Sequence, residues 1–432
     1  MPKLLPFRAL RYDPAAVGSV RDVVSPPYDI ISPERQAILA ARHPRNAVWI
    51  DLPPERAGDD PGAKYRRAGA AFAEWRADGT LIADPDPAVY AYEQSFSLPG
   101  DSELRTQRGF FVRLALEEYG PGSGVLPHER TMSGPKEDRY RLMEATAANL
   151  SPVIMLYRDR EDRAAERALA GICEAPALID VTDDDDVVHR VWRVPAGGAR
   201  GLGDLLVEVA SAAPLTIADG HHRYETALRY AREHGGGPGS AAGSIMVLLL
   251  AAGHGLSVLP THRVVRGGPP GDELLRGCAS LFEVEAIASA PALAEAFRPG
   301  AAEPPRGRFG FWTGSQAAIL RVRRDAFAPL VDPAGSETLR WLDVNVLAVA
   351  LERLAGISRD ATAAGGRLIY TKDAAEAIDL VDRGEGSAAF LLDPTAPEDV
   401  IAVAAAGEVM PQKSTYFYPK PVSGLLFHPF DL

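Results

Sequence analysis

Hydrophobic and polar residues alternate with two different periods along the chain. Alternation with a period of two predicts strands over Val89 to Leu98 and over Arg108 to Leu116, and Pro99-Gly100-Asp101 between them indicates a hairpin turn. Apolar residues spaced by three and four predict a helix over Lys64 to Asp78. Strands that alternate with helices, together with a hairpin, predict an α+β fold with mixed sheets and packed helices.

The same patterns extend through the rest of the chain. Thr395-x-x-Glu398 predicts a capping box for the last helix. Changes in pattern divide the chain into an N-terminal α+β region over 1–125, a core over 126–266 and a C-terminal α+β region over 267–432. Further strands are predicted over Leu4–Leu10, Val48–Leu52, Val153–Tyr157, Val187–Val194, Phe309–Trp312, Ala317–Val322 and Ala388–Leu392, and further helices over Asp162–Ala170, Asp272–Phe297, Leu339–Leu354 and from Asp373.

The densest group of reactive side chains lies between a predicted strand, Pro214 to Ala218, and a predicted helix, Tyr224 to Glu233. A strand-to-helix junction directs free N–H groups and the positive end of a helix at one point, so it suits an anion. Carboxylates can hold Mg²⁺ and a guanidinium can fork onto a phosphate. The alternative is a plain helix N-cap at the aspartate. The residues at this junction are Asp219, Gly220, His221, His222 and Arg223.

A second polar cluster occupies residues 126–139. His128, Lys136 and Arg139 supply positive or switchable donors, and Glu129 supplies an acid. Lys136 and Arg139 are three residues apart, so they share one side of a helix start and suit a phosphate. The alternative is a salt-bridged surface loop.

A third cluster, residues 410–420, contains Lys413, Ser414 and Thr415 in sequence. This triple suits a phosphate, but it lacks the glycines of a Walker A loop. The neighbouring aromatic residues suit either a stacking wall for a base or the core. We expect the C-terminal region to return this cluster to the site. Glu93, on a predicted strand, is an alternative to Glu129 as general base.

Composition excludes several classes of function. The net charge of −12 argues against nucleic-acid binding, and the 46% hydrophobic content is ordinary for a globular protein. No apolar run is long enough to span a membrane. The two cysteines, Cys173 and Cys278, have no metal-binding spacing, so we expect reduced thiols and a cytoplasmic location. Adjacent histidines diverge on a helix, which makes a zinc site at His221 and His222 unconvincing.

These motifs resemble a known family. Residues 217–227 (I-A-D-G-H-H-R-Y-E-T-A), the L-P-H-E and G-P-K elements of the second cluster, and M-P-Q-K-S-T-Y-F-Y-P-K near the end are similar to those of the domain-of-unknown-function 1015 family. The D-G-H-H-R element is also similar to one in the ADP-dependent serine kinase of the ParB/sulfiredoxin superfamily. The resemblance implies a ParB/sulfiredoxin-like nucleotide-binding core.

The residues and the resemblance together favour a nucleotide-dependent phosphotransferase acting on a small hydroxylated metabolite, with serine implied by resemblance. ATP or ADP would be the donor and Mg²⁺ the metal, bound by Asp219. Partners would be the nucleotide and a small substrate, without membrane or nucleic acid, and a homodimer is one option. The alternatives are a phosphatase or nucleotide hydrolase using the same site, and a non-enzymatic nucleotide-binding switch. Expected catalytic residues are Asp219, His221, His222 and Glu129, and expected phosphate- or nucleotide-binding residues are Gly220, Arg223, His128, Lys136, Arg139, Lys413, Ser414 and Thr415.

Overall fold

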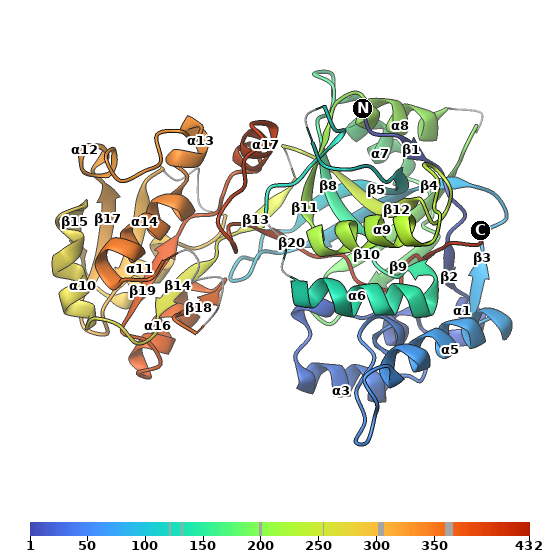
Figure 1. Ribbon diagram of the computed structural model, residues 1–432, viewed down its shortest axis with the longest axis horizontal. Coiled ribbons are helices and arrows are strands. Elements are labelled where there is room, and N and C mark those ends of the chain that lie inside the picture. Colours follow the sequence, from blue (N-terminus) through green and yellow to red (C-terminus); the bar gives the residue numbers. More distant parts are fainter. Residues whose placement is uncertain are drawn as a thin grey trace. The chain divides into compact units, whose positions relative to one another are not determined.

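The computed structural model describes residues 1–432 except 121, 130, 132, 198–200, 254, 301–305 and 359–365, and except the side chains of 133 and 135. The described chain forms two compact units, each discontinuous in sequence (Figure 1). The boundary expected after residue 125 falls within unit 1, and the boundary expected after residue 266 falls within unit 2. Unit 1 comprises Met1–Phe96, Leu104–Leu256 and Pro419–Leu432, and unit 2 comprises Ser97–Glu103 and Ser257–Tyr418.

A mixed nine-stranded sheet forms the centre of unit 1, in the order β6-β11-β8-β12-β5-β4-β10-β9, with β1 (Leu4–Leu5) beside β5. β12 pairs with β8 in parallel, and β11 pairs with β6 in parallel. β11 runs antiparallel to β8, so Asp219 lies beside Ile154, close to the start of β8. The other strands are β4 (Ala88–Phe96), β5 (Arg105–Ala115), β6 (Val125–Leu126), β8 (Val153–Tyr157), β9 (Ile179–Thr182), β10 (Val188–Pro195), β11 (Leu215–Asp219) and β12 (Ser244–Ala251).

Four helices cover one face of this sheet. They are α6 (Ser133–Thr146), α7 (Ala164–Ile172), α8 (Leu202–Ser211) and α9 (His221–Glu233). Alternate residues of β5, including Phe110 and Val112, face these helices and are fully buried together with Tyr224 of α9. Each large apolar side chain buried in this way contributes about 1.5–3 kcal/mol. This core fixes the β11–α9 junction on the sheet.

The first residues of unit 1 pack with its last residues in a second core, which includes Tyr12, Trp75 and Phe427. Backbone hydrogen bonds join Leu10 with Phe427 and Ser25 with Ser423 in both directions. The C-terminal segment therefore lies against the N-terminal loop. The elements of this part are β2 (Leu10–Tyr12), α1 (Pro14–Val17), α2 (Val20–Val23), η1 (Tyr28–Ile30), α3 (Pro33–Arg42), α4 (Val48–Asp51), α5 (Ala63–Ala77), β3 (Leu81–Ala83), β7 (Ala148–Asn149) and β21 (His428–Pro429).

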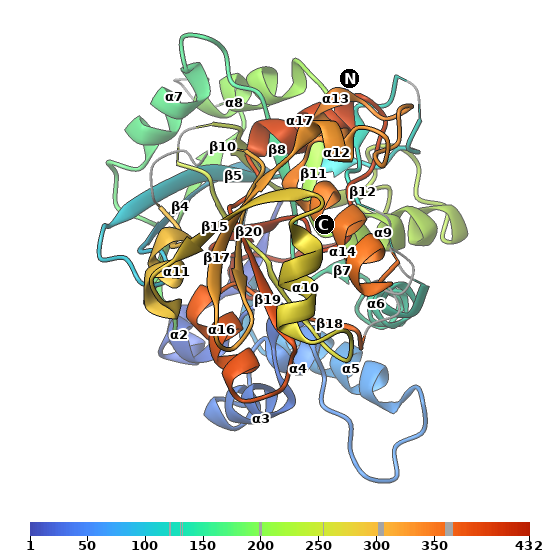
Figure 2. The same ribbon diagram turned by 90° about the vertical axis from the view of Figure 1, so that its left-hand side faces the viewer.

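Unit 2 contains a six-stranded sheet in the order β15-β17-β16-β19-β14-β18 and a separate pair, β13 with β20. Figure 2 shows α11 and α16 on one side of this sheet and α10 and α14 on the other. Its elements are β13 (Ser257–Leu259), β14 (His262–Val265), α10 (Gly271–Cys278), β15 (Phe282–Ile287), α11 (Ala290–Ala296), β16 (Arg308–Trp312), β17 (Ala317–Val322), α12 (Arg324–Phe327), α13 (Glu337–Arg340), α14 (Asp343–Ala355), β18 (Leu368–Thr371), α16 (Ala374–Asp382), β19 (Ala388–Leu392), α17 (Pro397–Ala405) and β20 (Tyr416–Tyr418).

The predicted α+β class with mixed sheets and packed helices is confirmed, but some predicted elements are wrong. Residues 48–51 form the helical turn α4, because the Asn46 side chain accepts a hydrogen bond from the Val48 N–H. The predicted capping box is absent. Thr395 donates its hydroxyl hydrogen to the Ser414 carbonyl, and α17 has no side-chain cap.

The single helix predicted over Asp272 to Phe297 is wrong as well. Two short helices, α10 and α11, flank strand β15. β15 is an edge strand with mostly exposed residues, so its alternation is weak and the flanking helical spacing masks it.

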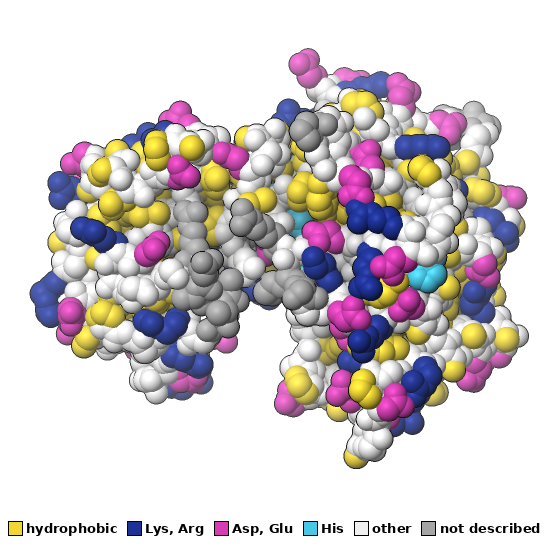
Figure 3. Space-filling model, in the orientation of Figure 1, with side chains coloured by type: hydrophobic (Ala, Val, Ile, Leu, Met, Phe, Trp, Pro, Cys, Tyr) yellow, Lys and Arg dark blue, Asp and Glu magenta, His cyan; other side chains and the backbone are white. Residues whose placement is uncertain are grey.

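Surface charges of both signs are interleaved over α6 and α9 (Figure 3). Glu137 pairs with Arg141 and Arg229, and Arg229 also pairs with Glu233. The net negative charge of the chain is therefore not collected over these two helices. No helix in the described part of the chain has both the length and the apolarity needed to cross a bilayer.

Candidate functional site

The turn between β11 and α9 brings the central motif into a tight bend. Gly220 stands at the N-cap of α9 with φ 96°, a backbone conformation that disfavours a Cβ atom. An added Cβ would also lie 2.9 Å from Arg223 Nε, so glycine lets this guanidinium fold back over the turn. The alternative of a plain N-cap at Asp219 is wrong, because the N-cap residue of α9 is Gly220 and no side chain caps the helix. The positive end of the α9 dipole lies at this turn.

Asp219 is held by two cations. One carboxylate oxygen accepts from Arg223, and the other lies 2.9 Å from Lys420 Nζ. Lys420 also bonds to Asp29 of the N-terminal loop, so its ammonium group joins two carboxylates. Burial opposes ionisation of Asp219, but Lys420 and Arg223 outweigh it and hold its pKa well below the ordinary range. Asp219 therefore stays ionised.

Arg223 is 8% exposed, and its two terminal nitrogens donate to Asp219 and to the Pro152 carbonyl. Its Nε is buried and has no partner among the described residues. Arg223 thus fixes the Asp219 carboxylate against the start of β8. Its expected role in phosphate binding stays a prediction.

Two histidines pack edge to face beneath this turn, with ring centroids 4.7 Å apart. Nδ1 of His128 lies 2.5 Å from the Ile217 carbonyl, which can only accept, and the His128 backbone N–H donates to Nε2 of His221. Burial lowers the pKa of His128 to about 4 and holds the pKa of His221 well below its ordinary value. Both imidazoles are consequently neutral at physiological pH, with fixed tautomers.

Part of the second predicted cluster docks against α9 through Glu225. One oxygen of Glu225 accepts from Lys136 Nζ at 2.9 Å and from the Thr131 hydroxyl at 2.7 Å. His222 is half-buried, and burial lowers its pKa below the ordinary value. Glu225 opposes this effect and Lys136 adds to it, so both charged groups lie near the His222 imidazole. Glu225 was not expected as a site residue, although it belongs to the same motif.

Arg139 is enclosed by protein groups. Its guanidinium donates to the backbone carbonyl of Asp51 at 2.6 Å and to Asp138, and it lies 4.0 Å from the centre of the Tyr28 ring. Ser423 in turn donates to the Asp51 carboxylate. Arg139 therefore ties α6 to the loop that carries Asp29, and its expected phosphate contact stays a prediction.

Residues 410–418 of the third predicted cluster belong to unit 2, whereas Pro419 and Lys420 belong to unit 1. Lys413 is exposed with φ 58°, and its carbonyl accepts from Arg263. Ser414 is buried and donates to the Pro411 carbonyl, while Thr415 is half-buried. The other expected site residues belong to unit 1. The expectation that 413–415 join them stays a prediction.

The two glutamates that were expected as alternative general bases lie in different parts of unit 1. Glu129 is half-buried and follows His128 directly in sequence, and its expected role as base stays a prediction. Glu93 on β4 pairs with Arg108 and Arg190, and β4 is four strands from β11, roughly 19 Å across the sheet. Within the described residues, no group of three or more His, Cys, Asp or Glu side chains is arranged for a metal ion. A metal role for Asp219 would therefore need ligands from a substrate.

The sequence interpretation missed Asp29 and Lys420 as site residues. Asp29 ends the sequence Pro26-Pro27-Tyr28-Asp29, and Lys420 is the last residue of the third cluster. Each of the two is a charged residue at the end of a short motif, and the local sequence gives no further indication that it belongs to the site. The contact between them depends on the docking of the C-terminal segment against the N-terminal loop, which periodicity does not report.

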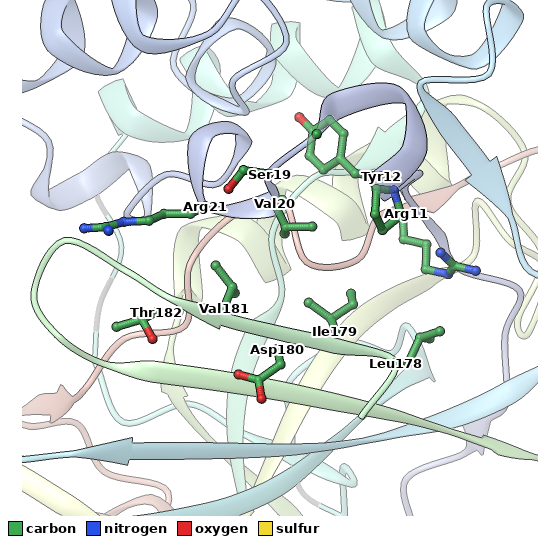
Figure 4. A pocket seen from close by; sticks show the side chains of 13 residues that line it. Arg11, Tyr12, Ser19, Val20, Arg21, Leu178, Ile179, Asp180, Val181 and Thr182 are labelled. Atoms are coloured by element: carbon green, nitrogen blue, oxygen red, sulfur yellow. The ribbon is translucent and has the colours of Figure 1, made fainter. Parts of the chain in front are cut away.

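Two cavities of unit 1 lie away from this cluster. One, of about 540 Å³, lies between β9 and the segment around α1 and α2 (Figure 4). Leu178 to Thr182 line one side of it, and Tyr12, Ser19 and Arg21 line the other. The second, of about 520 Å³, lies at the carboxyl ends of β8 and β12. Neither lining contains a residue of the D-G-H-H-R motif.

The profile of a family described as "Protein of unknown function (DUF1015)" matches residues 4–345. No curated protein matches the sequence significantly. Among solved structures, the chain is similar to a free serine kinase in complex with AMP, with 13% identity over 68% of this chain and 84% of that chain and a TM-score of 0.33. It is also similar to a conserved hypothetical protein from Pyrococcus furiosus (14% identity, 68% and 87% covered, TM-score 0.30) and to C-terminally truncated SbnI from Staphylococcus aureus (9%, 71% and 85%, 0.31).

Proposed function

The chain belongs to the DUF1015 family, whose description names no activity, and we propose that it is a nucleotide-dependent phosphotransferase acting on a small hydroxylated metabolite. One observation carries the proposal. The uncapped N-terminus of α9 lies beside a lysine shared by two carboxylates, with Arg223 packed behind it. A helix N-terminus supplies N–H donors to a phosphate, and an adjacent carboxylate supplies a base for phosphoryl transfer.

The charge balance of the site favours a nucleotide that brings its own cation. Lys420 and Arg223 carry two positive charges, Asp29 and Asp219 carry two negative charges, and the two buried histidines are neutral. Among these described groups, the helix dipole supplies the positive charge, about half a charge, that remains to attract a polyphosphate. A bound Mg²⁺ would supply the missing positive charge.

The residues fit such a metal. Mg²⁺ is commonly bound by one or two carboxylates together with substrate phosphates. Asp29 and Asp219 already direct oxygens at one cationic atom, Lys420 Nζ. We propose that Asp219 holds the metal and that Lys420 contacts the phosphates. When bound, the metal would neutralise charge on the transferring group.

Asp29 is the carboxylate that best suits the general base. It is more exposed than Asp219 (35% against 22%), and one of its oxygens is held by Lys420. In the transfer step the acceptor hydroxyl oxygen forms a new bond to phosphorus, and the bond from phosphorus to the leaving phosphate oxygen breaks. The hydroxyl proton passes to the Asp29 carboxylate.

Arg139 and Arg223 act as positioning residues in this proposal. Arg139 holds Tyr28, next to Asp29, and Arg223 holds Asp219. The neutral tautomers of His128 and His221 supply fixed hydrogen-bonding groups below the turn. The two histidines are neutral, and each arginine is paired with a carboxylate, Arg139 with Asp138 and Arg223 with Asp219.

Phosphorus NMR tests the proposal. The pure protein is incubated with Mg²⁺, ATP or ADP, and serine, which is the first acceptor to test because the D-G-H-H-R element resembles that of the serine kinase. A phosphorylated acceptor supports the proposal. Release of inorganic phosphate alone would instead indicate a hydrolase, and nucleotide binding without turnover would indicate a switch protein. Either result with a range of hydroxylated acceptors would overturn phosphotransfer.

A further inference from the structure

The 520 Å³ cavity of unit 1 and Asp219 lie at opposite ends of strand β8. β8 leads from Pro152, whose carbonyl binds Arg223, to Tyr157, which lines the cavity. Five strand residues span about 16 Å. Because β11 is antiparallel to β8, the D-G-H-H-R turn and this cavity are separate places. The cavity has the volume of a small-molecule pocket.

Apolar side chains line part of the cavity. They are Leu169 of α7 and Leu250 of β12, and Tyr157 lies beside them. Thr106 and Gln107 add polar groups to the lining. Tyr157 is 1% exposed, and its hydroxyl oxygen has less than 1 Å² of accessible surface, so a ligand in the cavity does not reach that oxygen. The cavity therefore offers an apolar surface to the body of a ligand.

The rim of the cavity is cationic. Four arginines and two carboxylates line it, which leaves two positive charges in excess; they are Arg108, Arg158, Arg160, Arg163, Asp159 and Glu166. Both carboxylates are engaged within the protein. Asp159 accepts from the backbone N–H groups of residues 165 and 166 at the start of α7, and Glu166 pairs with Arg163.

The arginines differ in how far their charge is balanced. Arg108 pairs with Glu93 and Arg160 pairs with Glu208, both outside the lining. Arg158 is exposed and takes part in none of the ion pairs that the described residues form. Its charge is therefore available at the mouth of the cavity, directly after Tyr157 in sequence.

We propose that this cavity binds a small organic anion, a carboxylate or a phosphate monoester, whose apolar body packs against Leu169 and Tyr157. The charged group meets Arg158 at the mouth of the cavity. The site is independent of the proposed phosphotransfer, because it shares no residue with the Asp219 cluster.

Titration calorimetry with naphthalene probes tests the site in the full chain. 1-Naphthyl phosphate and 1-naphthoate carry the two candidate anionic groups on the same apolar body, and 1-naphthol is uncharged at neutral pH. The variants are Arg158→Glu, which reverses the exposed charge, and Arg158→Ala, which removes it. Arg56→Ala is the matched control, since Arg56 is also exposed and lies outside the cavity.

At least one anionic probe should bind to the parent protein and to Arg56→Ala with equal affinity. Arg158→Glu should weaken binding about tenfold or more, and Arg158→Ala should weaken it by a smaller factor. The preference between the two anions identifies the ligand class. The proposal is overturned by equal binding to Arg158→Glu and Arg56→Ala, by 1-naphthol binding as tightly as the anions, or by no binding at about 1 mM probe.

Discussion

Replacing Lys420 with Met removes the ammonium group that joins the two carboxylates of the candidate site while keeping a side chain of similar length. Lys420 is 6% exposed, and its Nζ lies 2.9 Å from Asp219 and also bonds to Asp29. Breaking a buried ion pair by removing one partner costs about 3–5 kcal/mol. We expect a loss near the lower limit, about 3 kcal/mol, because Asp219 keeps Arg223.

The loss should depend on pH in a defined direction. In the parent protein the pKa of Asp219 is held well below its ordinary 3.8, despite burial, by Lys420 and Arg223. A carboxylate whose pKa is lower in the folded protein than in the unfolded protein stabilises the folded state at pH values above the unfolded-state pKa. This stabilisation is lost as the pH falls through the folded-state pKa. Without Lys420 the pKa of Asp219 rises. Acid then protonates this carboxylate in the variant, so the difference from the parent protein shrinks.

Urea unfolding at neutral pH and at about pH 4.5 measures both effects. The control is Arg141→Met, which breaks an exposed pair with Glu137 (46% and 47% exposed) and should change the free energy of unfolding far less than Lys420→Met does. A loss for Lys420→Met below about 1 kcal/mol at neutral pH would refute the buried pair. So would a loss that grows on acidification.

Three further substitutions separate chemistry from binding and from strain. Asp29→Asn should lower kcat about 10²–10⁴-fold and leave the nucleotide affinity unchanged. The control is Asp22→Asn in α2, which should leave kcat unchanged. Equal kcat values for the two variants would show that Asp29 is not the base. Asp219→Asn should abolish Mg²⁺-dependent turnover while circular dichroism shows a folded chain, and full activity would exclude its metal role. Gly220→Ala should destabilise the protein more than Gly79→Ala. Both glycines have positive φ, but of the two only Gly220 would place an added Cβ against a side chain. Equal midpoints of urea unfolding for the two variants would contradict this reasoning.

Much of the fold could be predicted because its elements carry their period in the local sequence. Val153–Tyr157 and Ala388–Leu392 were predicted with the observed bounds, since both are short buried apolar runs between turn residues. The strand predicted at residue 48 failed, because one apolar turn of helix and a short strand have the same composition. The division into units could not be predicted from local pattern, since each unit is assembled from separate parts of the chain.

The site was predictable only where its residues are adjacent in sequence. The turn at the D-G-H-H-R motif could be predicted from the motif itself, because a glycine between a strand and a helix can adopt the positive φ that the turn requires. Asp29 and Lys420 come from opposite ends of the chain and meet through the backbone pairing of Ser25 with Ser423. Nothing in the local pattern of either segment encodes this long-range contact.

The histidines give the last test of the mechanism, because they are the groups that ordinarily titrate near neutral pH. Burial lowers the pKa of His128 to about 4 and the pKa of His221 and His222 below the ordinary value, so protonation of none of the three should limit the rate at neutral pH. We therefore expect kcat/KM to be flat between about pH 6.5 and 8. An inflection near the ordinary histidine pKa, abolished by His221→Asn but not by substitution of half-buried His43, would show that an imidazole transfers the proton. Asp29 would then not be the base.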